Sequence, residues 1–232
     1  MLADLDTYSV ADFIPFTAEV YLRLVERHNA WAWPMQWLGV ALALVAIGLA
    51  WRGWGRAVAL ILTLAWLVVA VTYYARLYAE LTWAADYLAG AFIFQAGLML
   101  GAGLAGRFDA QQAMFSTSTL AARTVTAAAA IVIVLGLLGW PVLALLVGRG
   151  WAGTEWFGLM PAPTVVTSVG LLLYVVRPRW LWLLLPIPVA WAVVTAAVER
   201  TLDLPAFWLL LAAGALALLG VVAKAFVSSR ER

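Results

Sequence analysis

The chain consists mostly of long apolar runs that short polar connections separate. A helix needs about 20 predominantly apolar residues to cross about 30 Å of hydrocarbon. Seven runs meet this requirement, and each is bounded by charged residues, glycine or proline. They cover residues 34–51, 55–75, 84–106, 124–147, 161–177, 180–198 and 205–227. The pattern predicts an all-α fold, a polytopic bundle of seven transmembrane helices.

Residues 16–31, which precede the first run, show an amphipathic pattern. Apolar side chains recur at helical spacing at Phe16, Val20, Leu24 and Trp31, and charged residues lie between them. Thr17 follows a proline and is a candidate N-cap. We therefore expect an interfacial helix that lies along the outer headgroups. The expected organisation is an outer segment (1–33), a membrane domain (34–227) and a cytoplasmic tail (228–232).

Three prolines interrupt the predicted spans. Pro141 lies inside the fourth run, and Pro186 and Pro188 lie inside the sixth. Proline removes a helical N–H group and clashes with the preceding turn, so each position predicts a kink. A kink packed against its neighbours is one interpretation. A hinge, or a site lined by the freed carbonyl groups, is the other.

Composition narrows the classes of function. The chain is 66% apolar and 11% charged, whereas a soluble domain has about 45–50% apolar and about 25% charged residues. A net charge of only +2 argues against a nucleic-acid partner. With no cysteine and one histidine, no disulfide, metal site or cofactor is predicted. No catalytic motif occurs, so we do not expect an enzyme.

The distribution of Lys and Arg predicts the orientation. With seven spans, five of these residues fall on the side of the N-terminus and nine on the other side, which includes the short connections 52–56 and 177–179. Cytoplasmic loops carry the excess of positive charge. We therefore expect the N-terminus outside and the C-terminus in the cytoplasm. The Arg-rich, Lys-poor usage suggests a bacterial cytoplasmic membrane.

Tryptophan is abundant where the predicted helices meet the membrane surfaces. Such amphipathic rings anchor helices at headgroup depth. The predicted interface anchors are Trp31, Trp33, Trp37, Trp51, Trp54, Trp180 and Trp182. His28, the only histidine, lies in the same region. It is interpreted as a polar-tipped aromatic at the outer interface, with a metal ligand or proton carrier as the alternative.

Polar residues near the outer ends of the spans mark where a solute could bind. The central third of the spans contains no Asp, Glu, Lys or Arg, although ion-coupled transporters usually keep an ionisable residue there. The start of the fifth run, "PAPT" at 161–164, offers a helix N-terminus to an anion or is simply a capped start. The candidate ligand-binding residues are Asn29, Gln36, Tyr73, Tyr74, Arg76, Gln95 and Thr164.

Several stretches together resemble one family of bacterial membrane proteins, the domain of unknown function number 6064. The resemblance rests on Pro15-Phe16-Thr17, on Asn29, Trp33, Pro34 and Gln36, and on three longer stretches at 89–100, 139–173 and 183–197. It covers nearly the whole chain and implies a polytopic membrane architecture. The chain departs from the family at Ala162, often Cys, at Tyr74, often His, and at His28, usually Tyr. A shared metal or haem role at these positions is therefore not expected.

Two classes of function remain open. The first is an accessory or structural subunit of a larger membrane complex, because the spans lack mid-membrane charge. Its partners would be the lipid bilayer and other membrane subunits, or further copies of the chain in a homo-oligomer. The second is a transporter or binding protein for a small neutral or anionic solute, whose site lies in the outer half of the bundle.

Overall fold

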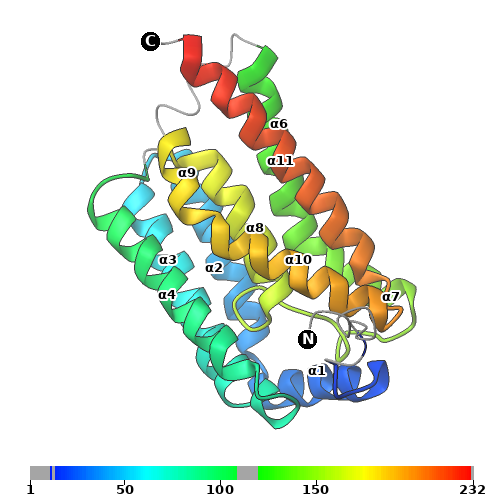
Figure 1. The fold of residues 1–232 in the computed structure, drawn as a ribbon. Coiled ribbons are helices and arrows are strands. Elements are labelled where there is room, and N and C mark those ends of the chain that lie inside the picture. Colours follow the sequence, from blue (N-terminus) through cyan, green and yellow to red (C-terminus); the bar gives the residue numbers. More distant parts are fainter. Residues whose placement is uncertain (1–10, 12–13, 109–119, 231–232) are drawn as a thin grey trace, which may run out of the picture.

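The computed structural model describes residues 11, 14–108 and 120–230, with side chains as far as residue 226. Within these ranges the chain is helical, and its one β-type contact is an isolated bridge between Phe108 and Val176. Figure 1 shows long helices that run side by side, with α1 lying across one end of them. The described residues therefore confirm the predicted all-α fold.

The first half of the chain runs from α1 to α4. It contains α1 (Ala18–Ala32), α2 (Met35–Trp51), α3 (Gly55–Val68), a π-helix (Val69–Ala75), a 3₁₀ turn (Tyr78–Glu80) and α4 (Ala85–Leu104). The π-helix continues α3 without a break, so the two form one long rod. The axes of α1 and α2 meet at 86°, which turns α1 across the end of the bundle.

The second half of the chain surrounds a short central helix. It contains α6 (Leu120–Val134), a π-helix (Leu135–Gly139), α7 (Trp140–Leu146), α8 (Pro161–Val175), α9 (Pro178–Leu184), α10 (Pro186–Thr201) and α11 (Ala206–Arg230). Every residue of α8 is buried. It contacts α2 and α3 on one side and α6, α10 and α11 on the other, as its place in the middle of Figure 1 shows.

Four helical segments are long and apolar enough to cross a membrane, namely Gly55–Glu80, Ala85–Leu104, Leu120–Leu146 and Ala206–Phe226. Two bent pairs, α1 with α2 and α9 with α10, raise the number of candidate spans to six. The fifteen-residue α8 is apolar but shorter. The length and composition of the described helices therefore support a multi-pass membrane protein with four to six candidate spans.

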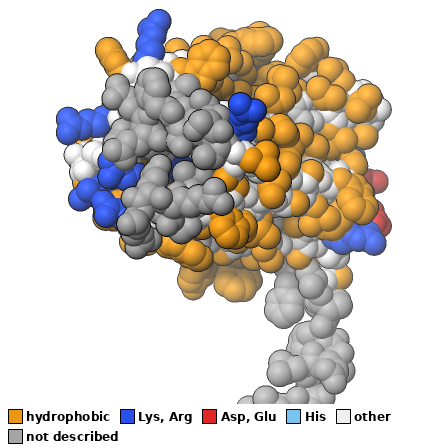
Figure 2. Space-filling view, turned by 90° about the horizontal axis from the view of Figure 1, so that it is seen from above, with side chains coloured by type: hydrophobic (Ala, Val, Ile, Leu, Met, Phe, Trp, Pro, Cys, Tyr) orange, Lys and Arg blue, Asp and Glu red, His pale blue; other side chains and the backbone are white. Residues whose placement is uncertain are grey.

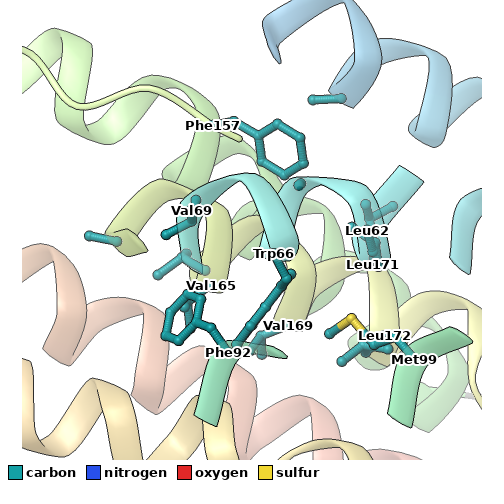
Figure 3. Packing of buried hydrophobic residues seen from close by; sticks show 14 of the residues in the cluster. Leu62, Trp66, Val69, Phe92, Met99, Phe157, Val165, Val169, Leu171 and Leu172 are labelled. Carbon is teal, nitrogen blue, oxygen red and sulfur yellow. The ribbon is translucent and has the colours of Figure 1, made fainter. Parts of the chain in front are cut away.

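Close backbone approach and one large ring hold α8 in place. A Cβ atom on Gly136 would lie 2.6 Å from the backbone nitrogen of Thr167, so only glycine fits where α8 crosses the second π-helix. Trp66 is fully buried and donates from Nε1 to Ser168 Oγ at 2.9 Å. Its ring packs against Phe92 with centroids 4.3 Å apart (Figure 3). These contacts join α3, α4 and α8 into one core.

The three span prolines coincide with irregular helix geometry. Pro186 and Pro188 begin α10, whose axis is bent by 52° from that of α9. Pro141 lies in the first turn of α7, directly after the second π-helix, and Leu120–Leu146 remains one candidate span there. A proline therefore widens the helix in one span and bends it in the other.

The amphipathic pattern of α1 predicted the helix and its cap but not its buried face. The side chain of Thr17 accepts a hydrogen bond from the N–H of Val20, as an N-cap does. However, Val20 is 41% and Trp31 is 54% exposed, so the predicted apolar stripe is not the face that packs against the bundle. The buried residues of α1 are Leu24, Val25, His28, Asn29 and Ala32. This face turns inward because its polar side chains meet polar groups of the loop before α8.

The two ends of the bundle differ in character. The end that carries α1 also carries the loops 76–84, 147–160 and 202–205, and we call it the α1 end. The opposite end carries Arg52, Arg177 and Arg179, and Figure 2, which views it, shows several Lys and Arg side chains there. The side chains of six predicted anchor tryptophans are exposed, namely Trp31, Trp33, Trp37, Trp51, Trp54 and Trp182. Trp180 is half-buried beneath Arg107.

Candidate functional site

A cavity of about 60 Å³ lies at the α1 end of the bundle. Its walls come from α1, the first π-helix, the 3₁₀ turn, α4, α10 and the start of α8. We call it the tyrosine pocket. Its polar and aromatic lining residues are Tyr21, Tyr73, Tyr74, Tyr78, Trp191, Thr195 and Glu199. Four phenol groups and a carboxyl group thus converge on a space that fits a few heavy atoms.

The first π-helix explains why two consecutive tyrosines line the pocket. A π-helix makes room for an extra residue in each turn and often occurs at functional sites. Tyr73 and Tyr74 are each only 2% exposed, and their rings meet edge to face with centroids 5.1 Å apart. Trp191 of α10 donates from Nε1 to the Tyr74 hydroxyl at 2.5 Å. This bond fixes α10 against the π-helix across the pocket.

Two buried carboxyl groups lie at the pocket. Glu199 lines it and is 3% exposed, and Glu155, from the loop before α8, is 2% exposed. Tyr21 donates to Glu155 Oε1 at 2.9 Å. The Oε2 atom of each glutamate has no hydrogen-bond partner among the described residues. The ion pairs of Arg27 with Glu80 and of Arg200 with Asp203 include neither Glu155 nor Glu199.

Burial controls the titration of Glu155. Desolvation disfavours the carboxylate and raises the pKa of Glu155 to about 7, against the opposing effects of the Tyr21 hydrogen bond and the charge of Arg149. Burial, followed by the charge of Glu155, also raises the pKa of Tyr21 well above its ordinary value. Glu155 is therefore a group whose charge changes near neutral pH.

His28 lies behind the pocket, and its ring is buried inside the protein. The residue is 1% exposed, and its ring packs edge-on against Tyr73 with centroids 5.9 Å apart. Burial lowers the pKa of His28 to about 4, although a backbone hydrogen bond with Leu159 opposes the shift. Position 28 turns inward because α1 packs over the loop before α8. The ring is neutral at physiological pH.

Asn29 and Gln36 form a structural tie outside the pocket. The amide of Asn29 donates to the carbonyl groups of Ala152 and Thr154 at 2.7 and 2.6 Å. Gln36 donates to the backbone carbonyl of Asn29 at 2.7 Å. These bonds fasten the 147–160 loop to the α1–α2 corner, which places Glu155 against Tyr21. Both residues therefore position the site without lining it.

Gln95 satisfies a backbone group that a proline leaves without a donor. In a regular helix the carbonyl of Leu184 would accept from the N–H of residue 188, but that residue is proline. Gln95 Nε2 donates to this carbonyl at 2.9 Å from α4. The predicted binding residue is thus a clamp between α4 and the bend, and it lies away from the tyrosine pocket.

The remaining two predicted residues also lie apart from the pocket lining. Thr164 donates to the carbonyl of Met160 and accepts from the N–H of Gly158, so it stabilises the first turn of α8. Arg76 is exposed, with its guanidinium 5.0 Å from the ring centroid of Trp31. Of the seven sequence-predicted residues, the structure brings only Tyr73 and Tyr74 into the pocket lining.

Sequence reasoning missed the other polar residues of the pocket. Glu199, Tyr21 and Tyr78 line the pocket, and Glu155 lies beside it. Acids and tyrosines at the ends of apolar runs are normally solvated, so their positions did not single them out. The one available signal was the apolar surroundings of Glu199, which follows the run "VAWAVVTAAV" within the same helix. Nothing in the spacing showed that α1 would cover Glu155.

A larger groove of about 720 Å³ lies between α8, α9, α10 and α11. All of its lining residues are apolar or glycine, and several, such as Trp182 and Leu218, are highly exposed. Its chemistry suits lipid hydrocarbon. Of these two cavities, the tyrosine pocket is the one that offers specific polar groups.

Comparisons with known proteins identify the family of this chain. Residues 18–232 match the pattern of a family described as a family of unknown function, DUF6064. No curated protein and no solved structure matches the chain. Because the match spans nearly all of the sequence, the chain belongs to the DUF6064 family.

Proposed function

We propose that this chain is a membrane-embedded binding protein or carrier for a small polar solute, and that the solute binds in the tyrosine pocket. The observation that carries the proposal is the buried carboxyl group of Glu199, a residue that lines the cavity and whose Oε2 atom has no hydrogen-bond partner among the described residues. A buried polar atom without a partner costs about 1–3 kcal/mol. A bound solute that donates a hydrogen bond would remove this penalty.

The proposed topology has seven spans. The four long segments and α2 account for five, α9 with α10 forms a broken sixth, and the buried α8 is a short seventh, with α1 as an interfacial helix. The α1 end faces outward and the C-terminus lies in the cytoplasm, following the excess of Lys and Arg at the opposite end. This orientation opens the tyrosine pocket towards the outer half of the membrane.

Cysteine labelling tests this orientation without background, because the chain contains no cysteine. Thr201 at the α1 end and Arg52 and Arg179 at the opposite end are exposed. In intact cells, a membrane-impermeant thiol reagent should label Thr201→Cys, and it should label Arg52→Cys and Arg179→Cys only after the membrane is permeabilised. The reverse pattern would show that the pocket faces the cytoplasm.

A pocket-filling variant tests the solute proposal. Ala162 lines the pocket and is 2% exposed, whereas Ala212 of α11 is exposed. A solute that binds the folded state raises the melting temperature. Any solute that stabilises the wild type should fail to stabilise Ala162→Leu and should still stabilise the control Ala212→Leu. If a broad screen of small polar solutes gives no shift that Ala162→Leu removes, the proposal is wrong.

The accessory-subunit hypothesis stays a separate prediction. Extraction in mild detergent followed by mass spectrometry should find stoichiometric partner chains if the protein is a subunit. A lone, monodisperse protein would contradict it.

A further inference from the structure

We propose that the solute of the tyrosine pocket is a small organic cation, with an ammonium group about the size of methylammonium. This inference rests on the proposed function and narrows it to one charge class. It draws on four features of the pocket: its carboxyl groups, its aromatic walls, the helix end beside it and its volume.

The carboxyl groups favour a positive ligand. Glu199 and Glu155 are close enough to repel each other electrostatically, and Arg149 is the cation whose charge acts on both. One arginine cannot neutralise two carboxylates, so the ionised pair would keep a net negative charge. A buried charge needs an opposite charge or hydrogen bonds to be stable. An ammonium group supplies both, because it carries a positive charge and hydrogen-bond donors.

The aromatic walls of the pocket also favour a positively charged ligand. The face of a phenol or indole ring is electrically negative and attracts cations within about 6 Å of its centre. Tyr73 and Tyr78 are stacked with centroids 5.6 Å apart, and Tyr74 meets Tyr78 edge to face. Trp191 closes the wall from α10. A cavity lined by aromatic rings and a carboxyl group is chemistry suited to an alkylammonium ion.

The helix end beside the pocket is unsuited to an anion. Anions bind helix N-termini through unpaired N–H groups of the first turn. Pro161 and Pro163 occupy the first and third positions of α8 and have no N–H group. The hydroxyl of Thr164 is already engaged with Met160 and Gly158. The anion site considered from the sequence therefore lacks two of the four N–H groups that a helix N-terminus offers.

The size of the pocket sets the size of the ligand. One water molecule requires about 10–15 Å³ of cavity volume, so about 60 Å³ takes a group of a few heavy atoms. A bare calcium ion would seek six to eight oxygen ligands. The described residues contain no cluster of three or more His, Asp or Glu side chains that could hold a metal ion. An organic cation needs only the carboxyl group and the rings.

Binding should strengthen as the pH rises. Burial disfavours the ionised form of a carboxyl group, whereas a bound cation favours it. Binding of a cation therefore releases a proton from the pocket. An alkylammonium ion resembles the side chain of lysine and stays charged up to a pH of about 10. The titratable or charged groups around Glu199 are Tyr21, Tyr73, Tyr74, Tyr78, Arg149, Glu155, Arg200 and Asp203. Of these groups, Glu155 and Glu199 are the ones whose ionisation makes cation binding depend on pH in this proposal.

Thermal stability of the purified chain in detergent tests the charge class with three probes of similar size, namely methylammonium, acetamide and acetate, at constant ionic strength. At a fixed concentration equal to ten times its dissociation constant at pH 8, methylammonium should raise the melting temperature at pH 8 by about 3–6 °C. The rise should be larger at pH 8 than at pH 6. It should fall below about 1 °C in Glu199→Gln and persist in Glu26→Gln, which removes an exposed acid of α1.

Three other outcomes would contradict one or both of the proposals. An equal methylammonium shift in Glu199→Gln would show a general ionic effect and overturn the cation proposal. A shift with acetamide or acetate alone that Ala162→Leu abolishes would overturn the cation proposal and support the solute function. If neither these probes nor the wider solute screen gives a shift sensitive to Ala162→Leu, both proposals fail.

Discussion

Replacing Gln95 with leucine is expected to lower the free energy of unfolding by about 1–3 kcal/mol, the penalty for a buried carbonyl without a donor. The carbonyl concerned is that of Leu184, which Pro188 leaves without its helical partner and which Gln95 now satisfies. Leucine fills a similar volume, so the loss would come mainly from the missing hydrogen bond. Chemical or thermal unfolding in detergent measures it.

A second substitution separates this explanation from a simple packing defect. In a Pro188→Ala background, the N–H of residue 188 becomes available to the Leu184 carbonyl across the bend between α9 and α10. Gln95→Leu should then cost less than about 0.5 kcal/mol, because the clamp is no longer needed. If Gln95→Leu destabilises both backgrounds equally, the carbonyl of Leu184 is not the group that Gln95 serves.

Glu155→Gln is expected to change how stability depends on pH. The folded chain holds the proton of Glu155 up to a pH of about 7, whereas the ordinary pKa is 4.5. Between these values the folded state binds more protons than the unfolded state, so the free energy of unfolding falls as the pH rises. The full difference corresponds to about 3 kcal/mol. Glu155→Gln removes this loss and should be more stable than the wild type above pH 7.

The titration of His28 changes stability in the opposite direction over nearly the same range of pH. The pKa of His28 is about 4 in the folded chain and 6.5 ordinarily. The unfolded state therefore binds the extra proton between these values, and stability rises with pH. The two slopes oppose each other between about pH 4.5 and 6.5 in the wild type.

The variants should separate these two contributions. Between about pH 4.5 and 6.5, the stability of Glu155→Gln should rise with pH relative to that of the wild type, because the variant lacks the opposing contribution of Glu155. Over the same range, the stability of His28→Asn should fall with pH relative to that of the wild type, because this variant lacks the opposing contribution of His28. Melting temperatures from pH 4.5 to 8 measure both profiles, with Glu26→Gln as a control at an exposed acid of α1. Parallel profiles in all four proteins would contradict the burial of both groups.

Local sequence patterns predicted the helices well because the apolar runs are long and their boundaries carry charge, glycine or proline. The bend between α9 and α10 was expected from Pro186 and Pro188, since proline breaks a helix wherever it occurs. The π-helix at Val69–Ala75 was not expected, because it contains no proline or glycine. Its geometry depends on how Tyr73 and Tyr74 pack against His28, Tyr78 and Phe92.

The candidate site was predicted less completely than the fold because it depends on tertiary contacts. Tyr21 and Glu155 are 134 residues apart and meet only because α1 turns by 86° and the Asn29 tie holds the loop. An acid near the end of an apolar run is normally solvated, and no local pattern shows that another helix covers it. Polar residues inside the runs were noticed, but Gln36, Gln95 and Thr164 serve backbone groups.

Equilibrium binding of isotope-labelled methylammonium to the purified chain tests the central claim most directly, because it counts bound ligand in the absence of any unfolding. The account predicts one saturable site per wild-type chain at pH 8. It predicts the loss of that site in Glu199→Gln and in Ala162→Leu, and its retention in Glu26→Gln and Ala212→Leu. Saturable binding that survives in Glu199→Gln, or no saturable binding to the wild type, would contradict the assignment of the tyrosine pocket as a cation site.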